Sequence, residues 1–124
     1  MSERFLKKII AQNHEDLRVI SALCSGAQIK QSELKFLKEN KIFLISLQRE
    51  NKEKQNNKEK INSILKFEFI EQSKSKNIDQ NDQENILELF AIEPFKKLNN
   101  NEIILLFSNN AIINLFCEVI ECTL

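Results

Sequence analysis

The spacing of apolar residues changes from helical to alternating near residue 26. Residues 4–11 (RFLKKIIA) predict a short opening strand. Asn13 then stands where a helix N-cap belongs, and Gly26, the only glycine, stands where a C-terminal cap is expected. Between them, apolar side chains recur three and four residues apart at Leu17, Ile20, Leu23 and Cys24. This spacing places them on one face and predicts a single helix near the N-terminus.

From Ala27 onward the period is two, as in half-buried strands. A hairpin is predicted, with a break at Ser32 and Glu33 in its first arm and a turn at residues 38–41. The stretch of about residues 49–60 contains no apolar side chain, so we expect a mobile polar loop there. The later strands are predicted at 61–78, 86–95, 102–107 and 111–121, with a second loop at 79–85.

Three side-chain placements follow from these strands. Leu65, Phe67 and Phe69 are expected on one buried face. Pro94 is expected to end its strand, because proline cannot donate a ladder hydrogen bond. The last stretch, AIINLFCEVIE, is expected to be one strand whose apolar face carries Ile113, Leu115, Cys117 and Val119.

The pattern as a whole predicts an α+β fold. We expect one N-terminal helix packed on a curved, mostly antiparallel sheet of about seven or eight strands, either partly closed like a barrel or sandwich-like. Residues 1–124 fit one domain, because a second core would be too small to be stable at this length.

Composition and charge narrow the classes of function. The longest apolar runs fall short of the roughly 18 residues of a membrane helix, and residues 1–16 lack the apolar region of an export signal. We therefore expect a cytoplasmic protein without a membrane partner, whose three cysteines are reduced. Residues 1–62 carry 13 Lys and Arg against 8 Asp and Glu, whereas residues 63–124 carry 5 against 10. With a pI of about 6.6 this disfavours nucleic acid as a partner.

The candidate chemistry is sparse. Cys24, Glu118 and Glu121 are the candidates for a polar site, but on a regular strand the two glutamates would point to opposite faces. His14, the only histidine, lies in the first helical turn without an evident orienting partner. Residues 79–84 lack the ligand spacing of a calcium loop, and one glycine cannot build a phosphate-binding loop. The sequence thus assigns no catalytic residue, metal or cofactor.

A non-enzymatic protein-interaction or regulatory domain is therefore the leading interpretation. Its partner would be another protein, or a second copy joined through an open sheet edge. The alternative is a small-ligand-binding protein or minor enzyme that uses a pocket between helix and sheet, with Cys24 or Glu118 as its polar feature. RNA binding through the basic N-terminal half is a third, disfavoured possibility.

The order of several segments resembles a known family. Glu15-Asp16-Leu17 followed by VISA, the pair Ile78-Asp79, and the ending with Glu118, Ile120 and Glu121 are similar to a bacterial family known as domain of unknown function 2948, over roughly residues 8–124. Where that family tends to have glycine, this chain has asparagine, at Asn77 and at Asn109 and Asn110. Asparagine also tolerates left-handed backbone, so the fold expectation is unchanged. The resemblance implies a small cytoplasmic bacterial domain. It supplies no catalytic residues, because the family has no assigned activity.

Overall fold

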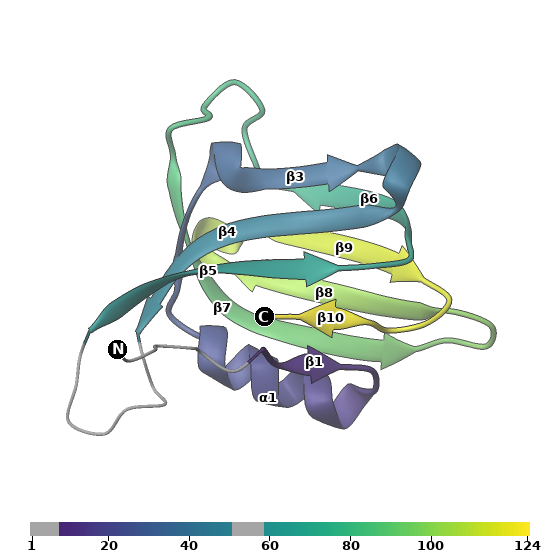
Figure 1. Cartoon of the computed structure of the whole chain (residues 1–124). Coiled ribbons are helices and arrows are strands. Elements are labelled where there is room, and N and C mark those ends of the chain that lie inside the picture. The colour runs from purple at the N-terminus through teal and green to yellow at the C-terminus, as the bar shows by residue number, and fades with distance from the viewer. Residues whose placement is uncertain (1–7, 51–58) are drawn as a thin grey trace.

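The computed structural model describes residues 8–50 and 59–124, which form one α-helix and ten strands (Figure 1). Three short 3-10 helices, Gln31–Glu33, Lys38–Asn40 and Ser108–Asn110, connect some of the strands. The elements in chain order are β1 (Ile10–Ala11), α1 (His14–Cys24), β2 (Gln28–Lys30), β3 (Leu34–Leu37), β4 (Ile42–Glu50), β5 (Lys60–Phe67), β6 (Ile70–Lys76), β7 (Ile86–Lys96), β8 (Asn101–Phe107), β9 (Ile112–Cys117) and β10 (Cys122–Thr123). The α+β class and the single N-terminal helix are confirmed. The strand count exceeds the prediction of seven or eight, because residues 61–78 and 111–124 each form two strands.

Two predicted segments fall partly outside the described residues. Of the loop expected at about 49–60, positions 51–58 lie outside them, whereas Arg49 and Glu50 belong to β4 and Lys60 belongs to β5. Residues 4–7 of the predicted opening strand also lie outside the described residues. In the described part of that segment the strand is β1, which has two residues.

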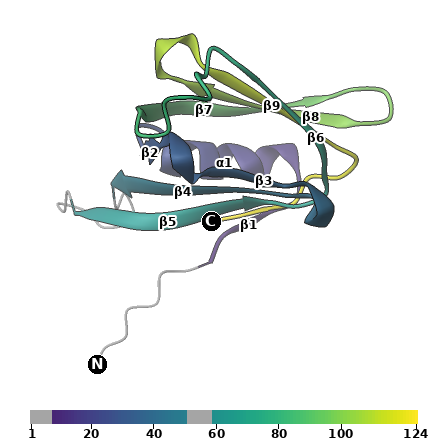
Figure 2. The ribbon, with the colours of Figure 1, turned by 90° about the horizontal axis from the view of Figure 1, so that it is seen from above.

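The strands form one bent, antiparallel sheet in the order β1-β10-β5-β4-β2-β7-β8-β9-β6, and β3 also pairs with β4. The bend brings β3, β4, β5, β10 and β1 over β7, β8, β9 and β6 as two layers (Figures 1 and 2). The buried apolar side chains of both layers and of α1 form one core cluster. Among the described residues the sheet does not close into a barrel, so the sandwich-like form of the prediction is the one observed.

Helix α1 is defined by its caps and by its apolar face. The Asn13 side chain accepts a hydrogen bond from the Asp16 backbone N–H at 2.7 Å, which satisfies one of the unpaired amides of the first turn. Leu17, Ile20 and Cys24 are buried in the core. Gly26 has φ +89°, a left-handed conformation in which glycine carries no Cβ penalty. The helix, its N-cap and its terminal glycine are thus confirmed.

The same segment also covers one edge of β7. The Gly26 N–H donates to the Leu89 carbonyl, and the Leu89 N–H donates to the Ala27 carbonyl, each at 2.8 Å. Three residues later the Ile92 N–H donates to the Ser21 hydroxyl at 2.9 Å. Beyond Leu89 the helix therefore takes the place of a neighbouring strand.

This arrangement explains why the prediction for Pro94 was wrong. Strand β7 continues through Pro94 to Lys96, and Pro94 lies opposite Ile103 of β8. Alternate residues of a strand point their backbone nitrogens to the same side. The Ile92 N–H points to the helix, so the backbone nitrogen of Pro94 points to the helix as well. Proline is tolerated there because no strand requires a hydrogen bond on that side.

The chain crosses between the layers after Phe67. Leu65 and Phe67 are buried as predicted, but Phe69 is 46% exposed and has φ +63°, so its predicted place on the same face was wrong. The strand breaks at residues 68 and 69, where the chain leaves one layer to begin β6 in the other. Where the chain changes layer, the side chains that follow no longer continue the alternation of the strand before. The pattern of apolar residues in the sequence does not indicate where this change occurs.

The predicted closing strand is also divided. Ile113, Leu115 and Cys117 are buried as expected, but β9 ends at Cys117 and Val119 is 52% exposed. Residues 118–121 connect β9 to β10, which returns to the other layer and pairs with β5. The left-handed expectation for asparagine is confirmed, since Asn77, Asn109 and Asn110 have φ of 62°, 60° and 62°.

Candidate binding groove

The three cysteines are buried thiols in the core. Burial raises the pKa of the Cys117 thiol to about 11, and the Glu71 carboxylate adds to the rise. Burial likewise raises the pKa of the Cys122 thiol, and the neighbouring Cys24 thiol adds to it. The structure therefore brings Cys24 and Cys122 together, in surroundings that hold Cys122 in its neutral form.

The two glutamates lie in the connection between β9 and β10 rather than on a strand. Glu118 is exposed, and its backbone carbonyl accepts a hydrogen bond from Asn101 Nδ2 at 2.8 Å. Glu121 is half-buried, and its Oε1 accepts from Gln12 Nε2 at 3.2 Å. The prediction that they occupy opposite faces of one strand was wrong, because that strand ends before them.

His14 and the acidic loop have structural contacts. His14 Nε2 lies 3.4 Å from Asn101 Oδ1, at the junction of α1 and β8. Within residues 79–85, the Asp79 side chain accepts from the Asn81 N–H at 2.9 Å, which is a local turn contact. In residues 8–50 and 59–124, no group of three or more His, Cys, Asp or Glu side chains gathers in a way that could hold a metal ion.

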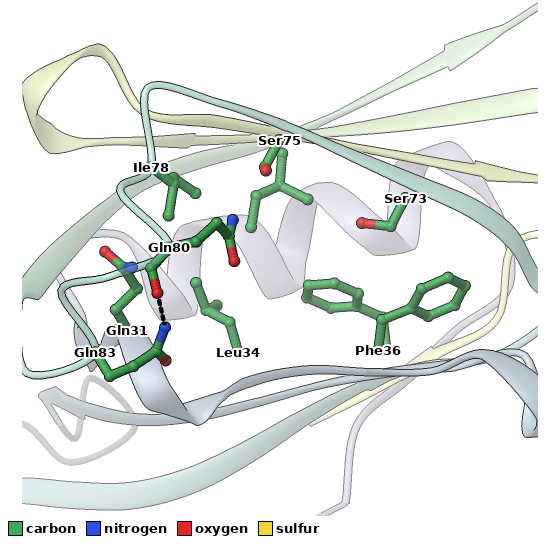
Figure 3. A pocket seen from close by; sticks show the side chains of 10 residues that line it. Gln31, Leu34, Phe36, Ser73, Ser75, Ile78, Gln80 and Gln83 are labelled. Atoms are coloured by element: carbon green, nitrogen blue, oxygen red, sulfur yellow. Dashed lines mark hydrogen bonds between the residues drawn. The ribbon is translucent and has the colours of Figure 1, made fainter.

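A groove of about 220 Å³ opens between β3 and β6, on the other side of the core from α1 (Figure 3). Five apolar side chains line it: Leu34, Phe36, Phe43, Ile78 and Ile113. Five neutral polar side chains complete the lining: Gln31, Ser73, Ser75, Gln80 and Gln83. The ten lining residues therefore combine an apolar surface with hydrogen-bonding groups and carry no charge.

Backbone hydrogen bonds close both ends of the groove. At one end the Gln31 N–H donates to the Asn85 carbonyl at 2.8 Å and the Ser32 N–H donates to the Gln83 carbonyl at 3.0 Å. The Gln31 side chain, which is buried, donates to the Asp79 carbonyl. These bonds tie loop 79–85 to the break between β2 and β3.

At the other end the Ile70 N–H donates to the Lys41 carbonyl at 2.8 Å, and Lys41 forms an ion pair with Glu71 at 3.2 Å. Between these two closures, β3 pairs only with β4 and β6 pairs only with β9 in the described part of the chain. Each strand therefore has one edge without a neighbouring strand, and the groove opens between these two edges.

The groove was not predicted from the sequence, although one signal for it is present. Along β6, Gln72, Lys74 and Lys76 alternate with Ser73 and Ser75. The serines occupy the inward positions, opposite Leu115 and Ile113 of β9. Small polar residues at inward positions of an amphipathic strand leave space that larger apolar residues would fill, and they therefore mark a cavity.

The fold and the groove define a small α+β domain with an uncharged groove between two open strand edges. The chain belongs to the family described as protein of unknown function DUF2948, which matches residues 7–124 and confirms the resemblance noted above. No curated protein and no solved structure matches the chain significantly. Among the described residues, no helix has both the length and the apolar character needed to cross a bilayer.

Proposed function

We propose that this protein is a non-enzymatic protein-interaction domain that binds an extended segment of a partner protein in the groove between β3 and β6. The observation that carries the proposal is the presence of two open strand edges beside an uncharged groove lined by both apolar and polar side chains. In strand addition, the backbone of the bound segment pairs with an edge, and every second side chain enters a pocket.

The size of the groove supports a side chain as its occupant. Sites for small molecules and cofactors usually measure about 300–1,000 Å³, which exceeds the volume found here. One or two apolar side chains fit the smaller space. Strand β6 is the edge we select, because its seven residues offer more backbone groups than the four of β3.

The uncharged lining of the groove supports binding rather than catalysis. General acid–base chemistry needs a titratable group within hydrogen-bond reach of the substrate, and the lining consists of Gln, Ser, Leu, Phe and Ile. The serine hydroxyls and glutamine amides instead suit the peptide groups of a bound segment. We therefore expect a ligand segment with a bulky apolar residue and no charge at the positions that face the groove.

The proposal describes residues 1–124 as one folding unit in the bacterial cytoplasm. The buried Cys24, Cys117 and Cys122 thiols suit a reducing compartment. The alternative of a pocket between helix and sheet has less support, because Leu17, Ile20 and Cys24 fill that space with fully buried side chains.

A selection of extended peptides tests the proposal. A displayed library of random peptides is selected on the wild-type protein, and the enriched peptides are measured by fluorescence anisotropy. The blocking variant is Ser75→Lys, which places a charge in the groove. The matched control is Gln72→Lys, which places the same charge on the same strand but on its other face.

We expect enriched peptides with apolar residues two positions apart. Their affinity should fall at least about tenfold in Ser75→Lys and change little in Gln72→Lys, because only the first variant buries an unpaired charge in the complex. A selection without enrichment, or equal binding by both variants, would overturn the proposal.

A further inference from the structure

The outer face of the layer formed by β7, β8, β9 and β6 has no cover within the described residues. The pairing register defines three rows of outward side chains across the four strands: Ala91–Leu106–Ile112–Lys76, Glu93–Ile104–Asn114–Lys74 and Phe95–Glu102–Phe116–Gln72. We call these twelve residues and the adjacent Phe90 the outer face. Helix α1 and the strands of the other layer lie on the opposite side of this layer (Figure 2).

The outer face is unusually apolar for a surface that contacts only solvent. Phe90 and Phe95 are each 49% exposed. Ile104, Leu106, Ile112 and Phe116 are half-buried beside them. Contiguous apolar patches of this kind mark interaction sites, because burying them removes apolar area from water.

Charges on the outer face are separated by strand. Glu93, on β7, lies at one side, whereas Lys74 and Lys76, on β6, lie at the other side. Between them the Glu102 carboxylate accepts hydrogen bonds from Lys97 Nζ at 2.8 Å and from Asn114 Nδ2. The centre is therefore close to neutral, with an acidic margin on one side and a basic margin on the other.

A surface with this layout is complementary to itself. A two-fold axis parallel to the strands, placed between two facing sheets, lays β7 of each copy over β6 of the other. Glu93 of one copy then faces Lys74 of the other, because both residues belong to the same row. Leu106 and Ile112 belong to one row on the adjacent strands β8 and β9, so they meet near the axis.

We propose that two copies of this chain form a dimer by packing their outer faces together, with the acidic margin of each over the basic margin of the other. The interaction is independent of the groove, which opens between the layers. Aligned sheets that pack face to face are separated by about 10 Å, which leaves room for the side chains of both faces to interdigitate.

The dimensions of the outer face imply a moderate affinity. Four strands about 4.8 Å apart, with roughly six residues of about 3.3 Å rise each, give a projected area on the order of 400 Å². A standard interface buries about 800 Å² of accessible surface per partner, so this dimer belongs at the small end of specific interfaces. We expect dissociation in the micromolar range.

An exposed aromatic sheet could also serve as an RNA platform. The Glu93 carboxylate opposes that use, because it adds negative charge to the strand that carries Phe90 and Phe95. Lys74, whose Nζ lies 5.6 Å from the centre of the Phe116 ring, also covers a ring on which a base would stack. A second copy of the chain therefore fits this surface better than a nucleic acid.

Sedimentation velocity of the full chain over about 1–500 µM tests the dimer, a range that brackets a micromolar dissociation constant. Leu106→Lys should abolish the dimer, because it buries two unpaired charges near the axis. Ile64→Lys is the matched control, since Ile64 is an exposed apolar residue of β5 in the other layer. That variant should dimerise like the wild type.

A charge exchange tests the orientation. Glu93→Lys and Lys74→Glu should each weaken the dimer by about tenfold, and the double variant should recover most of the loss, as in a double-mutant cycle for a contacting pair. Within one chain two strands separate these residues, so recovery reports a contact between copies. All three variants change surface residues, and circular dichroism verifies their folding.

Three results would overturn the proposal. The first is a monomer at every concentration, and the second is a dimer that survives Leu106→Lys. The third is a pair of single charge variants whose losses simply add in the double variant. Salt-sensitive binding of a uridine oligonucleotide that Leu106→Lys abolishes would instead assign the outer face to RNA.

Discussion

The hydrogen bond from the Ile92 N–H to the Ser21 hydroxyl is the contact by which α1 takes the place of a strand beside β7. Ile92 is buried, so Ser21→Ala leaves its N–H group without a partner and out of reach of water. An unsatisfied buried backbone group costs about 1–3 kcal/mol. Alanine has a higher helix propensity than serine and returns about 0.5 kcal/mol. The net loss in the free energy of unfolding should therefore be about 0.5–2.5 kcal/mol.

This loss is measurable by thermal or urea unfolding followed by circular dichroism. Unfolding entropy of about 2.1 cal/mol/K per residue, applied to the whole chain, makes 1 kcal/mol equivalent to about 4 °C, so the midpoint should fall by about 2–10 °C. Ser21→Thr keeps the hydroxyl and should recover most of the stability. Val19→Ala, at an exposed position of the same helix, should stay within about 0.5 kcal/mol of the wild type.

Hydrogen exchange at the Ile92 amide provides the local measurement. Its exchange should accelerate in Ser21→Ala more than the exchange of amides that pair β8 with β9. If Ser21→Ala unfolds with the wild-type free energy and the Ile92 amide exchanges at its original rate, the helix does not substitute for a strand at this edge.

Three further outcomes are expected. The pKa of Glu102 is lowered, mainly by its hydrogen bond from Lys97, so the ionised carboxylate stabilises the fold at pH values above its unfolded-state pKa of about 4.3. The difference in unfolding free energy between wild type and Glu102→Gln should therefore shrink as the pH falls below about 4. With a pKa of about 11 the Cys117 thiol holds roughly 0.1% thiolate at pH 8, so maleimide labelling should be at least about a hundredfold slower in the native protein than in urea. Asn109→Gly should retain wild-type stability, whereas Asn109→Val should lose about 1–2 kcal/mol in urea unfolding, because φ is 60° there.

Features that depend only on neighbouring residues in the chain could be predicted from the sequence. The cap at Asn13, the left-handed glycine at Gly26 and the asparagine turns are properties of a few consecutive residues, and each is found where the pattern places it. The α+β class follows from the same information, because a period change from helical to alternating is a local feature.

The errors share one physical origin. Phe69, Pro94 and Val119 lie where the chain changes layer or where a strand borders the helix instead of another strand. Neither situation alters the local pattern of apolar residues, so the sequence predicts a regular alternation of buried and exposed side chains at each of these positions. Cys24, Glu118 and Glu121 were singled out by chemical type, but burial and turns decide which of them meets solvent.

The sequence by itself determined the helix, the alternation of the strands and the glycine-like turns, because backbone preference and side-chain period act over a few residues. Tertiary structure decided that β3 and β6 face each other across a groove, although residues 38–69 separate them in the chain. It also decided that β7, with its glutamate, and β6, with its lysines, form the two opposite margins of the outer face. The groove arises from how the sheet bends, whereas the two charged margins arise from the order of the strands within one layer. Both depend on the packing of the whole core rather than on any single segment.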